Sequence, residues 1–162
     1  SFVGISLGGW LALKFAAAYP DKICKLALLC PAGIGPQKAS VMLYALPLKL
    51  LGKWGEKEAI RKVMGMNEIS EETIEYSRLI SKNFSPFMGV IPVFSDEELK
   101  RLTNPIMLIA GDKDVLLDSK KTVERAKKVL PHAQIILLSG AGHGLINQKE
   151  RIITFLRGKD IS

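Results

Sequence analysis

A serine flanked by glycines lies close to the start of the sequence, in the pentapeptide Gly4-Ile5-Ser6-Leu7-Gly8. This G-x-S-x-G pattern is typical of a sharp strand-to-helix turn that exposes the serine hydroxyl as a nucleophile. The two glycines would let the strand and the helix approach each other without Cβ clashes. The backbone N–H of Leu7, at the start of the helix, would be placed to stabilise a negatively charged oxygen. The pentapeptide therefore predicts a nucleophile at Ser6 and one oxyanion donor at Leu7.

A serine hydroxyl is a weak nucleophile at neutral pH, so it needs a base to accept its proton and an acid to orient the base. The chain contains two histidines. His143 lies in the sequence GAGHGL directly after the last apolar run. In α/β proteins, active-site and ligand-binding residues commonly lie in such loops at the carboxyl ends of strands. His132 lies between a predicted helix and a predicted strand, and we expect it to have no catalytic role. His143 is therefore the expected base.

Three aspartates follow the apolar run IMLIA in the sequence GDKDVLLD, and each is a candidate for the acid. Asp118 directly precedes a predicted helix, where the helix dipole favours a carboxylate. Asp112 and Asp114 remain as candidates for the residue that orients the histidine.

Short apolar runs alternate with helical patterns around these residues. Pro20 ends a mostly apolar helix that follows Ser6, and apolar residues recur at helical spacing between residues 119 and 130. Strands that alternate with helices indicate an α/β fold with a mainly parallel sheet and flanking helices. We expect strands at residues 2–5, 25–30, 106–111 and 133–139, and helices at residues 7–19, 119–130 and 148–156.

Residues 34–103 break this alternation, since they contain helical signals and no convincing strand. Ser70 is a plausible N-cap, and the sequence SDEELKRL contains a capping box that starts at Ser95. Connections within α/β units usually take only a few residues, so an insertion of this length is more often functional than incidental. We therefore divide the chain into a core of residues 1–33 and 104–162 and a helical insertion of residues 34–103.

The composition argues against several classes of protein. The 162 residues are 48% hydrophobic, which is enough for one packed core, and no apolar run approaches the roughly 20 residues of a membrane-spanning helix. The net charge of +7 is spread over the three segments as +2, +1 and +4, and no aromatic pattern accompanies it. We therefore expect neither nucleic-acid nor membrane binding.

The two cysteines, Cys24 and Cys30, are too few for a disulfide framework and lack the spacing of a metal site. We expect both to be buried thiols in a reducing compartment. The sequence contains no signal-peptide pattern, so we expect a cytoplasmic protein.

The three motifs together resemble the α/β-hydrolase superfamily. In that family the acid stands last in a G-x-x-D turn, which the sequence GDKD matches, so the resemblance selects Asp114 and leaves Asp112 as the fallback. The chain order Ser6, Asp114, His143 is also the order of the family. The resemblance implies a partial α/β-hydrolase fold in which residues 34–103 form a helical cap over the active site.

The resemblance also implies that parts of such an enzyme are not in this sequence. Family members have several strands before the nucleophile strand, and a loop among them supplies the second oxyanion donor. The sequence thus resembles the C-terminal part of a larger hydrolase, with all three triad residues and half of the oxyanion hole. Residues 1–5 would then form an open apolar strand edge, through which we expect the chain to self-associate, aggregate or bind the missing segment.

The function that the resemblance implies is hydrolysis of carboxylic esters, with Ser6, His143 and Asp114 as the triad and with no cofactor or metal. Thioesters, lactones, amides and carbon–carbon bonds would use the same residues, whereas the dehalogenase and epoxide hydrolase branches carry Asp in place of the serine. A binding module that keeps the fold without the chemistry is the alternative from another class.

Apolar side chains in the insertion indicate a small, modestly apolar substrate. Any single one of them more often packs the cap itself than lines a pocket, so the inference is collective. The residues are Met42, Leu46, Leu50, Met64, Met66, Phe84, Phe87, Met88 and Phe94.

Overall fold

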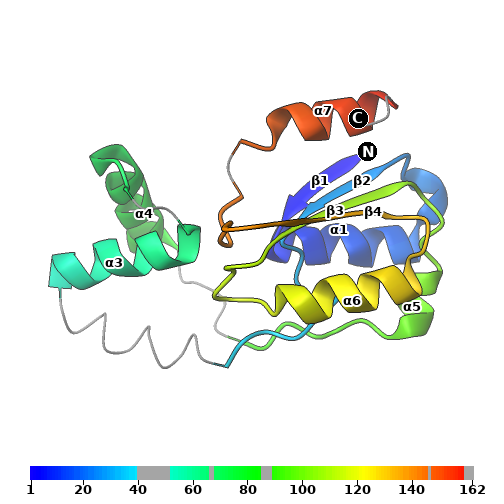
Figure 1. Cartoon of the computed structure of the whole chain (residues 1–162), viewed down its shortest axis with the longest axis horizontal. Coiled ribbons are helices and arrows are strands. Elements are labelled where there is room, and N and C mark those ends of the chain that lie inside the picture. Colours follow the sequence, from blue (N-terminus) through cyan, green and yellow to red (C-terminus); the bar gives the residue numbers. More distant parts are fainter. Residues whose placement is uncertain (40–51, 66–67, 85–88, 146, 159–162) are drawn as a thin grey trace.

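The computed structural model describes residues 1–39, 52–65, 68–84, 89–145 and 147–158. Strands and helices alternate at both ends of this chain, and a group of helices lies between the second and third strands (Figure 1). The order is β1 (Phe2–Ile5), α1 (Leu7–Ala18), η1 (Pro20–Lys22), β2 (Leu26–Leu29), α3 (Gly52–Met64), α4 (Glu71–Asn83), α5 (Asp96–Lys100), β3 (Ile106–Gly111), α6 (Ser119–Val129), β4 (Gln134–Leu138) and α7 (Lys149–Arg157).

The four strands form one sheet in the order β1-β2-β3-β4, and every neighbouring pair is parallel. The expected α/β fold with a parallel sheet and flanking helices is confirmed. Ile5 pairs with Leu29, and Leu29 pairs with Ile109. Because all strands run in one direction, the residues that follow them lie together at the carboxyl ends of the strands.

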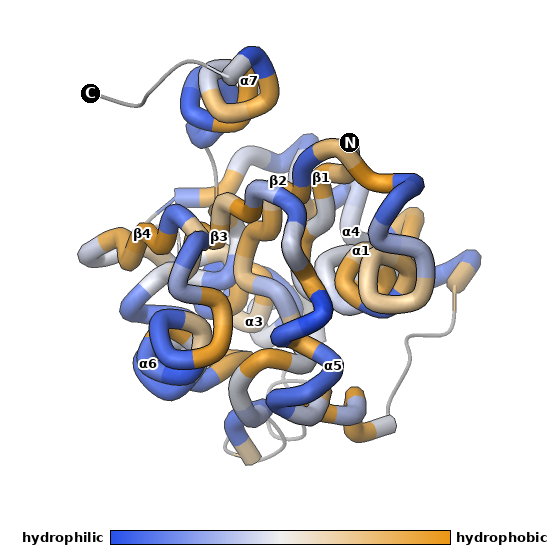
Figure 2. Tube along the Cα trace, turned by 90° about the vertical axis from the view of Figure 1, so that its right-hand side faces the viewer, coloured by the Kyte–Doolittle hydropathy of each residue, from blue (hydrophilic) through white to orange (hydrophobic). Residues whose placement is uncertain are grey.

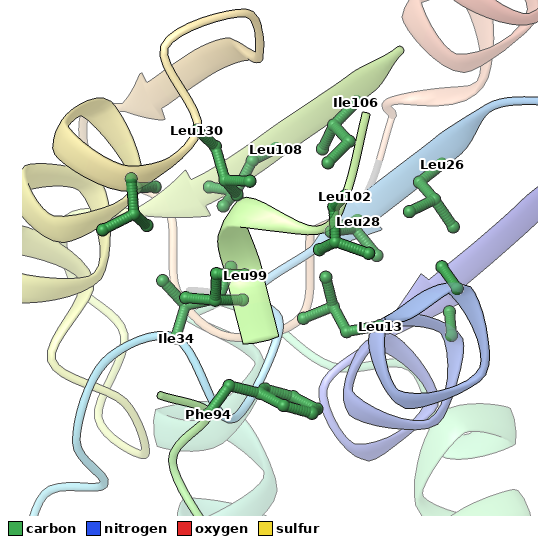
Figure 3. Close-up of a cluster of buried hydrophobic side chains, with 14 of the residues drawn as sticks. Leu13, Leu26, Leu28, Ile34, Phe94, Leu99, Leu102, Ile106, Leu108 and Leu130 are labelled. Atoms are coloured by element: carbon green, nitrogen blue, oxygen red, sulfur yellow. The ribbon is translucent and has the colours of Figure 1, made fainter. Parts of the chain in front are cut away.

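Helices cover both faces of the sheet, with α1 and α6 on one face and α7 on the other (Figure 1). Every residue of β2 and β3 is buried, as expected for strands that are covered on both faces. Leu28 and Leu108 face the α1 and α6 side, where Leu13 and Leu130 complete a leucine-rich core (Figure 3). The alternate strand residues pack on the opposite face against Phe155 of α7.

The helix signals in the sequence act as predicted. The Ser70 hydroxyl accepts a hydrogen bond from the Thr73 N–H, and Ser95 and Glu98 form the reciprocal capping box of α5. Helix α6 turns its buried residues, Val123 and Ala126 among them, toward the sheet, and its outer side is hydrophilic (Figure 2).

Helices α3 and α4 pack on each other and lie beyond the carboxyl ends of the strands (Figure 1). Helix α5 instead contacts α1 and α6, and its Leu99 lies in the core of the sheet together with Phe94 and Leu102. The segment between β2 and β3 therefore contributes both to the core and to the space above the strand ends.

The two cysteines differ in burial. Cys30 is buried directly after β2, as expected, but Cys24 is exposed, so the expectation of two buried thiols is wrong for Cys24. Cys24 lies in the turn between η1 and β2, before the chain enters the covered part of the sheet. Among the described residues, no helix is long and apolar enough to cross a membrane.

Candidate active site

Ser6 occupies a sharp turn between β1, which ends at Ile5, and α1, which begins at Leu7. Its φ of 52° and ψ of −117° lie in a region that residues with a side chain rarely adopt. Its N–H donates to the Leu29 carbonyl, and its own carbonyl accepts from the Ala32 N–H at 3.1 Å. The neighbouring strand therefore holds the strained turn in place, and the Ser6 side chain makes no capping hydrogen bond that would occupy its hydroxyl.

The glycines around Ser6 play unequal roles. A Cβ at Gly4 would lie 2.6 Å from the Gly8 carbonyl oxygen, so Gly4 does permit the close approach of strand and helix. A Cβ at Gly8 would meet nothing within 4 Å, whereas one at Gly9 would lie 2.9 Å from the Pro31 Cβ. The crowded helix position is therefore Gly9, and the expected steric reason for glycine at position 8 is wrong.

Asp114 and His143 form a buried pair. The Nδ1 atom of His143 lies 2.8 Å from Oδ2 of Asp114, and the two residues are 7% and 1% exposed. Asp114 stands in the turn after β3, and His143 stands in the loop after β4. The parallel sheet thus brings together two residues that are 29 positions apart.

The second carboxylate oxygen of Asp114 is bound by its own turn. Oδ1 accepts hydrogen bonds from the N–H groups of Leu116 and Leu117, at 2.8 and 3.0 Å. Burial alone would raise the pKa of Asp114, but the hydrogen bonds from His143 and from these two N–H groups outweigh it and hold the pKa below the usual value. The carboxylate is therefore ionised at neutral pH.

The ionised carboxylate fixes the tautomer of the histidine. A carboxylate can only accept hydrogen bonds, so Nδ1 of His143 carries the proton that is donated to Asp114. In the neutral imidazole, Nε2 is then unprotonated and able to accept a proton from a nucleophile. This arrangement has the chemistry of a general base.

The end of α3 braces the loop that carries His143. The His143 N–H donates to the Val63 carbonyl at 3.1 Å. A Cβ at Gly142 would lie 2.5 Å from the Gly65 Cα, and a Cβ at Gly144 would lie 2.7 Å from the Met64 sulfur. This packing could not be predicted from the sequence, because the two segments that form it are about eighty positions apart and share no local pattern.

Lys38 braces the Asp114 turn from the other side. Its Nζ donates to the Asp114 carbonyl oxygen at 2.5 Å, and its N–H donates to the Leu116 carbonyl. An antiparallel bridge between Gln37 and Leu117 adjoins this contact. The segment after β2 therefore helps to position the acid, a role that no local sequence pattern indicates.

Cys30 adjoins the Asp114 and His143 pair. Its Sγ, an Asp114 carboxylate oxygen and a His143 ring nitrogen all lie within 4.8 Å of one another. Cys30 has a φ of 39° and is 2% exposed. Burial, together with the Asp114 carboxylate, raises the pKa of the Cys30 thiol to about 12, so the thiol is protonated.

Asp112, the fallback for the acid, and His132, for which we expected no catalytic role, have other hydrogen-bond partners. Asp112 directs its carboxylate to the loop after β4, where Oδ1 accepts a hydrogen bond from the Gly140 N–H at 2.7 Å. His132 lies before the amino end of β4, whereas His143 follows its carboxyl end. The Nε2 atom of His132 lies 3.1 Å from the Asn104 carbonyl oxygen.

Ser6 follows β1 and therefore lies, like the Asp114 and His143 pair, at the carboxyl ends of the parallel strands. No hydrogen bond joins the Ser6 hydroxyl to His143 in the described part of the chain. Such contacts are often long before a substrate binds, so the geometry is compatible with a triad. Leu7 is the first residue of α1, where backbone N–H groups lack helical acceptors, so its N–H is a candidate oxyanion donor.

Three of the apolar residues proposed for a substrate pocket fall within the described chain. Phe94 stacks on Trp10 with ring centroids 5.5 Å apart and is 4% exposed, so it belongs to the core. Phe84 is exposed, and Met64 is the one that contacts the His143 loop. The remaining six lie outside the described residues: Met42, Leu46, Leu50, Met66, Phe87 and Met88.

The chain is similar to several hydrolases of known sequence. Carboxylesterase YbfK of Bacillus subtilis is 24% identical over an alignment that covers 96% of this chain and 56% of YbfK. Mouse monoacylglycerol lipase ABHD6 is 26% identical, with coverage of 92% of this chain and 51% of the lipase. The chain thus spans about half the length of these relatives.

The fold of the chain is also similar to that of solved hydrolase structures. The crystal structure of carboxylesterase CesB (YbfK) from Bacillus subtilis superposes with a TM-score of 0.77 at 25% identity, covering 98% of this chain and 60% of that one. The naproxen esterase from the same organism gives 0.76 at 25% identity, with coverage of 95% and 58%. The sheet and its helices therefore match a partial α/β-hydrolase fold. A family model described as "Alpha/beta hydrolase family" matches residues 1–153, and the chain belongs to that family.

Proposed function

We propose that this chain supplies the nucleophile, base and acid of a serine hydrolase that acts on carboxylic esters. The observation that carries the proposal is the buried 2.8 Å contact between His143 Nδ1 and Asp114 Oδ2. This contact lies at the carboxyl ends of the strands, where Ser6 occupies a strained turn. Relatives described as carboxylesterases and monoacylglycerol lipases support an ester as the substrate class.

The reaction would proceed in two halves. Ser6 Oγ forms a bond to the ester carbonyl carbon while its proton passes to His143 Nε2, and the Leu7 N–H donates to the oxyanion. The alkoxide leaves with the proton from Nε2, which produces an acyl-enzyme. Water then attacks the acyl carbon and gives a proton to Nε2. The bond between the acyl carbon and Ser6 Oγ breaks, Oγ takes the proton back from Nε2, and the carboxylic acid leaves. Asp114 stabilises the imidazolium that forms in each half.

We propose that helices α3 and α4 belong to a cap of residues 34–103 that shapes the substrate pocket. Helix α3 ends against the His143 loop, and Met64 places a polarisable apolar side chain there. A small, modestly apolar ester fits this environment. Thioesters, lactones and carbon–carbon bonds remain alternative substrates of the same residues, and a non-catalytic binding module remains the alternative class.

Self-association of the chain through β1 is a further part of the proposal. Phe2, Val3 and Ile5 are exposed on this edge strand, and β1 pairs on one side only within the described sheet. An open apolar edge is a template for pairing with another chain.

Covalent labelling tests the catalytic proposal directly. A fluorophosphonate probe should add once to the wild-type chain, as measured by intact mass, and the adduct should disappear in Ser6→Ala but persist in Ser139→Ala, an exposed serine that follows β4. His143→Gln should also abolish labelling, whereas His132→Gln should retain it. A chain that is folded by circular dichroism but takes no adduct would contradict the proposal and favour the binding module.

A further inference from the structure

Three side chains of types that bind transition metals meet at the carboxyl ends of β2, β3 and β4. The Cys30 Sγ, an Asp114 carboxylate oxygen and a His143 ring nitrogen lie within 4.8 Å of one another, and all three residues are buried. They follow three adjacent strands, so the sheet itself fixes their mutual distances. The mechanism above uses the aspartate and the histidine but gives the thiol no role.

The spacing of these atoms suits one small cation. Zinc binds sulfur at about 2.3 Å and histidine nitrogen or carboxylate oxygen at about 2.0–2.2 Å, so two tetrahedral ligands stand roughly 3 to 4 Å apart. Rotation of the Cys30 side chain would bring its Sγ closer to the other two atoms, and the 2.8 Å contact between His143 Nδ1 and Asp114 Oδ2 would widen to admit the ion.

We propose that Cys30, Asp114 and His143 form a binding site for Zn²⁺. The Cys30 thiol would lose its proton to solvent and bind as the thiolate, and Asp114 would bind through a carboxylate oxygen. The imidazole would move its proton from Nδ1 to Nε2 and bind through Nδ1, the nitrogen that faces Asp114. The thiolate and the carboxylate together carry two negative charges, which neutralise the ion in a buried place where an unpaired charge would be costly. Water would fill the fourth position.

The donor set selects the class of metal. A thiolate and an imidazole favour zinc and similar soft ions, whereas Mg²⁺ and Ca²⁺ prefer sites made entirely of oxygen atoms.

Zinc binding and ester hydrolysis would exclude each other. The ion would replace the hydrogen bond between Asp114 Oδ2 and His143 Nδ1 and would leave Nε2 protonated. The histidine could then not accept a proton from Ser6, so bound Zn²⁺ would inhibit. This consequence rests on the proposed function, but the binding itself does not, and metal binding is therefore measured independently of catalysis.

The exposed second cysteine determines the design of the test. The chain has only two cysteines, so Cys24→Ser leaves Cys30 as the sole thiol. In this background, Cd²⁺ should produce the ultraviolet thiolate-to-metal charge-transfer band, and equilibrium dialysis should find one Zn²⁺ per chain. Adding Cys30→Ser should remove the band and weaken Zn²⁺ binding by more than about tenfold, since even residues that merely support metal ligands cost that much when lost.

Two results would overturn the site: a folded Cys24→Ser chain without the Cd²⁺ band, or Zn²⁺ affinity that Cys30→Ser leaves unchanged. If Cys30→Ser does not fold, His143→Gln takes its place with His132→Gln as the matched control, and equal Zn²⁺ affinity in both overturns the site. Fluorophosphonate labelling of Ser6, measured without metal, separates the two proposals. Labelling without Zn²⁺ binding refutes only the metal site, and Zn²⁺ binding without labelling refutes only the hydrolase.

Discussion

His143 Nδ1 and Asp114 Oδ2 are 2.8 Å apart, and the other oxygen of the same carboxylate is held by two backbone N–H groups. The aspartate therefore links the imidazole to the rigid turn after β3. An imidazole on a glycine-rich loop gains from this contact both a fixed orientation and a fixed tautomer.

Replacement of Asp114 by Asn should test that link. The amide keeps the shape and can still accept the backbone hydrogen bonds, but its NH₂ group facing the ring would favour the tautomer with the proton on Nε2. We expect the rate of fluorophosphonate labelling at Ser6 to fall about 10⁴-fold, the size of the effect of the same change in a well-studied triad. Asp112→Asn is the matched control and should label at the wild-type rate. Equal rates for both variants would refute the role of Asp114.

The same aspartate should contribute to the pH dependence of stability. Its pKa in the folded chain lies below the ordinary 3.8, so the unfolded chain binds the proton at a higher pH than the folded chain does. The stabilisation is therefore complete above about pH 5 and is lost as the pH falls through about 4 toward the lowered pKa. Urea unfolding of wild type and Asp114→Asn at a series of pH values should give a difference in free energy of unfolding that shrinks on acidification. A difference that stays constant down to about pH 3 would contradict this assignment.

The strands could be predicted because β2 and β3 are apolar at every position, a pattern that local sequence reports directly. Placement after parallel strands predicted that His143 would meet Asp112 or Asp114, and the resemblance of GDKD to the family's G-x-x-D turn selected Asp114. Contacts made by distant segments could not be predicted in this way. The packing of Gly65 on Gly142 depends on where α3 ends in space, and the approach of Cys30 to Asp114 depends on a φ of 39° that no local pattern indicates.

The steric roles of the glycines could not be predicted from the motif either. The G-x-S-x-G pattern does not distinguish its two glycines. In the structure, a Cβ at Gly4 would collide with the helix backbone, whereas a Cβ at Gly8 would point into open space. The direction of a glycine's missing side chain depends on the helix orientation, which the spacing of residues does not encode.

This asymmetry gives a paired prediction. Gly4→Ala would place a Cβ 2.6 Å from the Gly8 carbonyl oxygen and 2.8 Å from the Gly9 nitrogen, and backbone atoms cannot rotate away. We expect the free energy of unfolding to fall by about 1–3 kcal/mol, the usual cost of overpacking. Gly8→Ala meets no atom within 4 Å and removes a glycine from a helix, so it should leave stability unchanged or raise it by up to about 1 kcal/mol. Urea unfolding measures both, and equal losses in the two variants would show that the turn is packed differently.

The exposed edge of β1 continues onto α1. Leu7, Leu11, Phe15 and Tyr19 recur at every fourth position of the helix region and are exposed, and Phe15 contacts Phe2 with ring centroids 5.3 Å apart. Four-residue spacing places these side chains on one side of the helix, so strand and helix together present a continuous apolar surface. A surface of this kind that remains exposed favours association.

A charge on this surface should therefore reduce self-association. Val3 is 52% exposed on the edge strand, and a lysine there would carry its charge into any strand pairing, which is how natural edge strands avoid pairing with one another. We expect sedimentation velocity to detect dimers or larger species of the wild-type chain that decrease in Val3→Lys. Val90→Lys adds the same charge at a valine that is 80% exposed outside this surface, so it controls for the effect of net charge. A wild-type chain that stays monomeric at every concentration would refute association through β1. An equal decrease in both variants would mean that charge repulsion rather than the edge of β1 governs association.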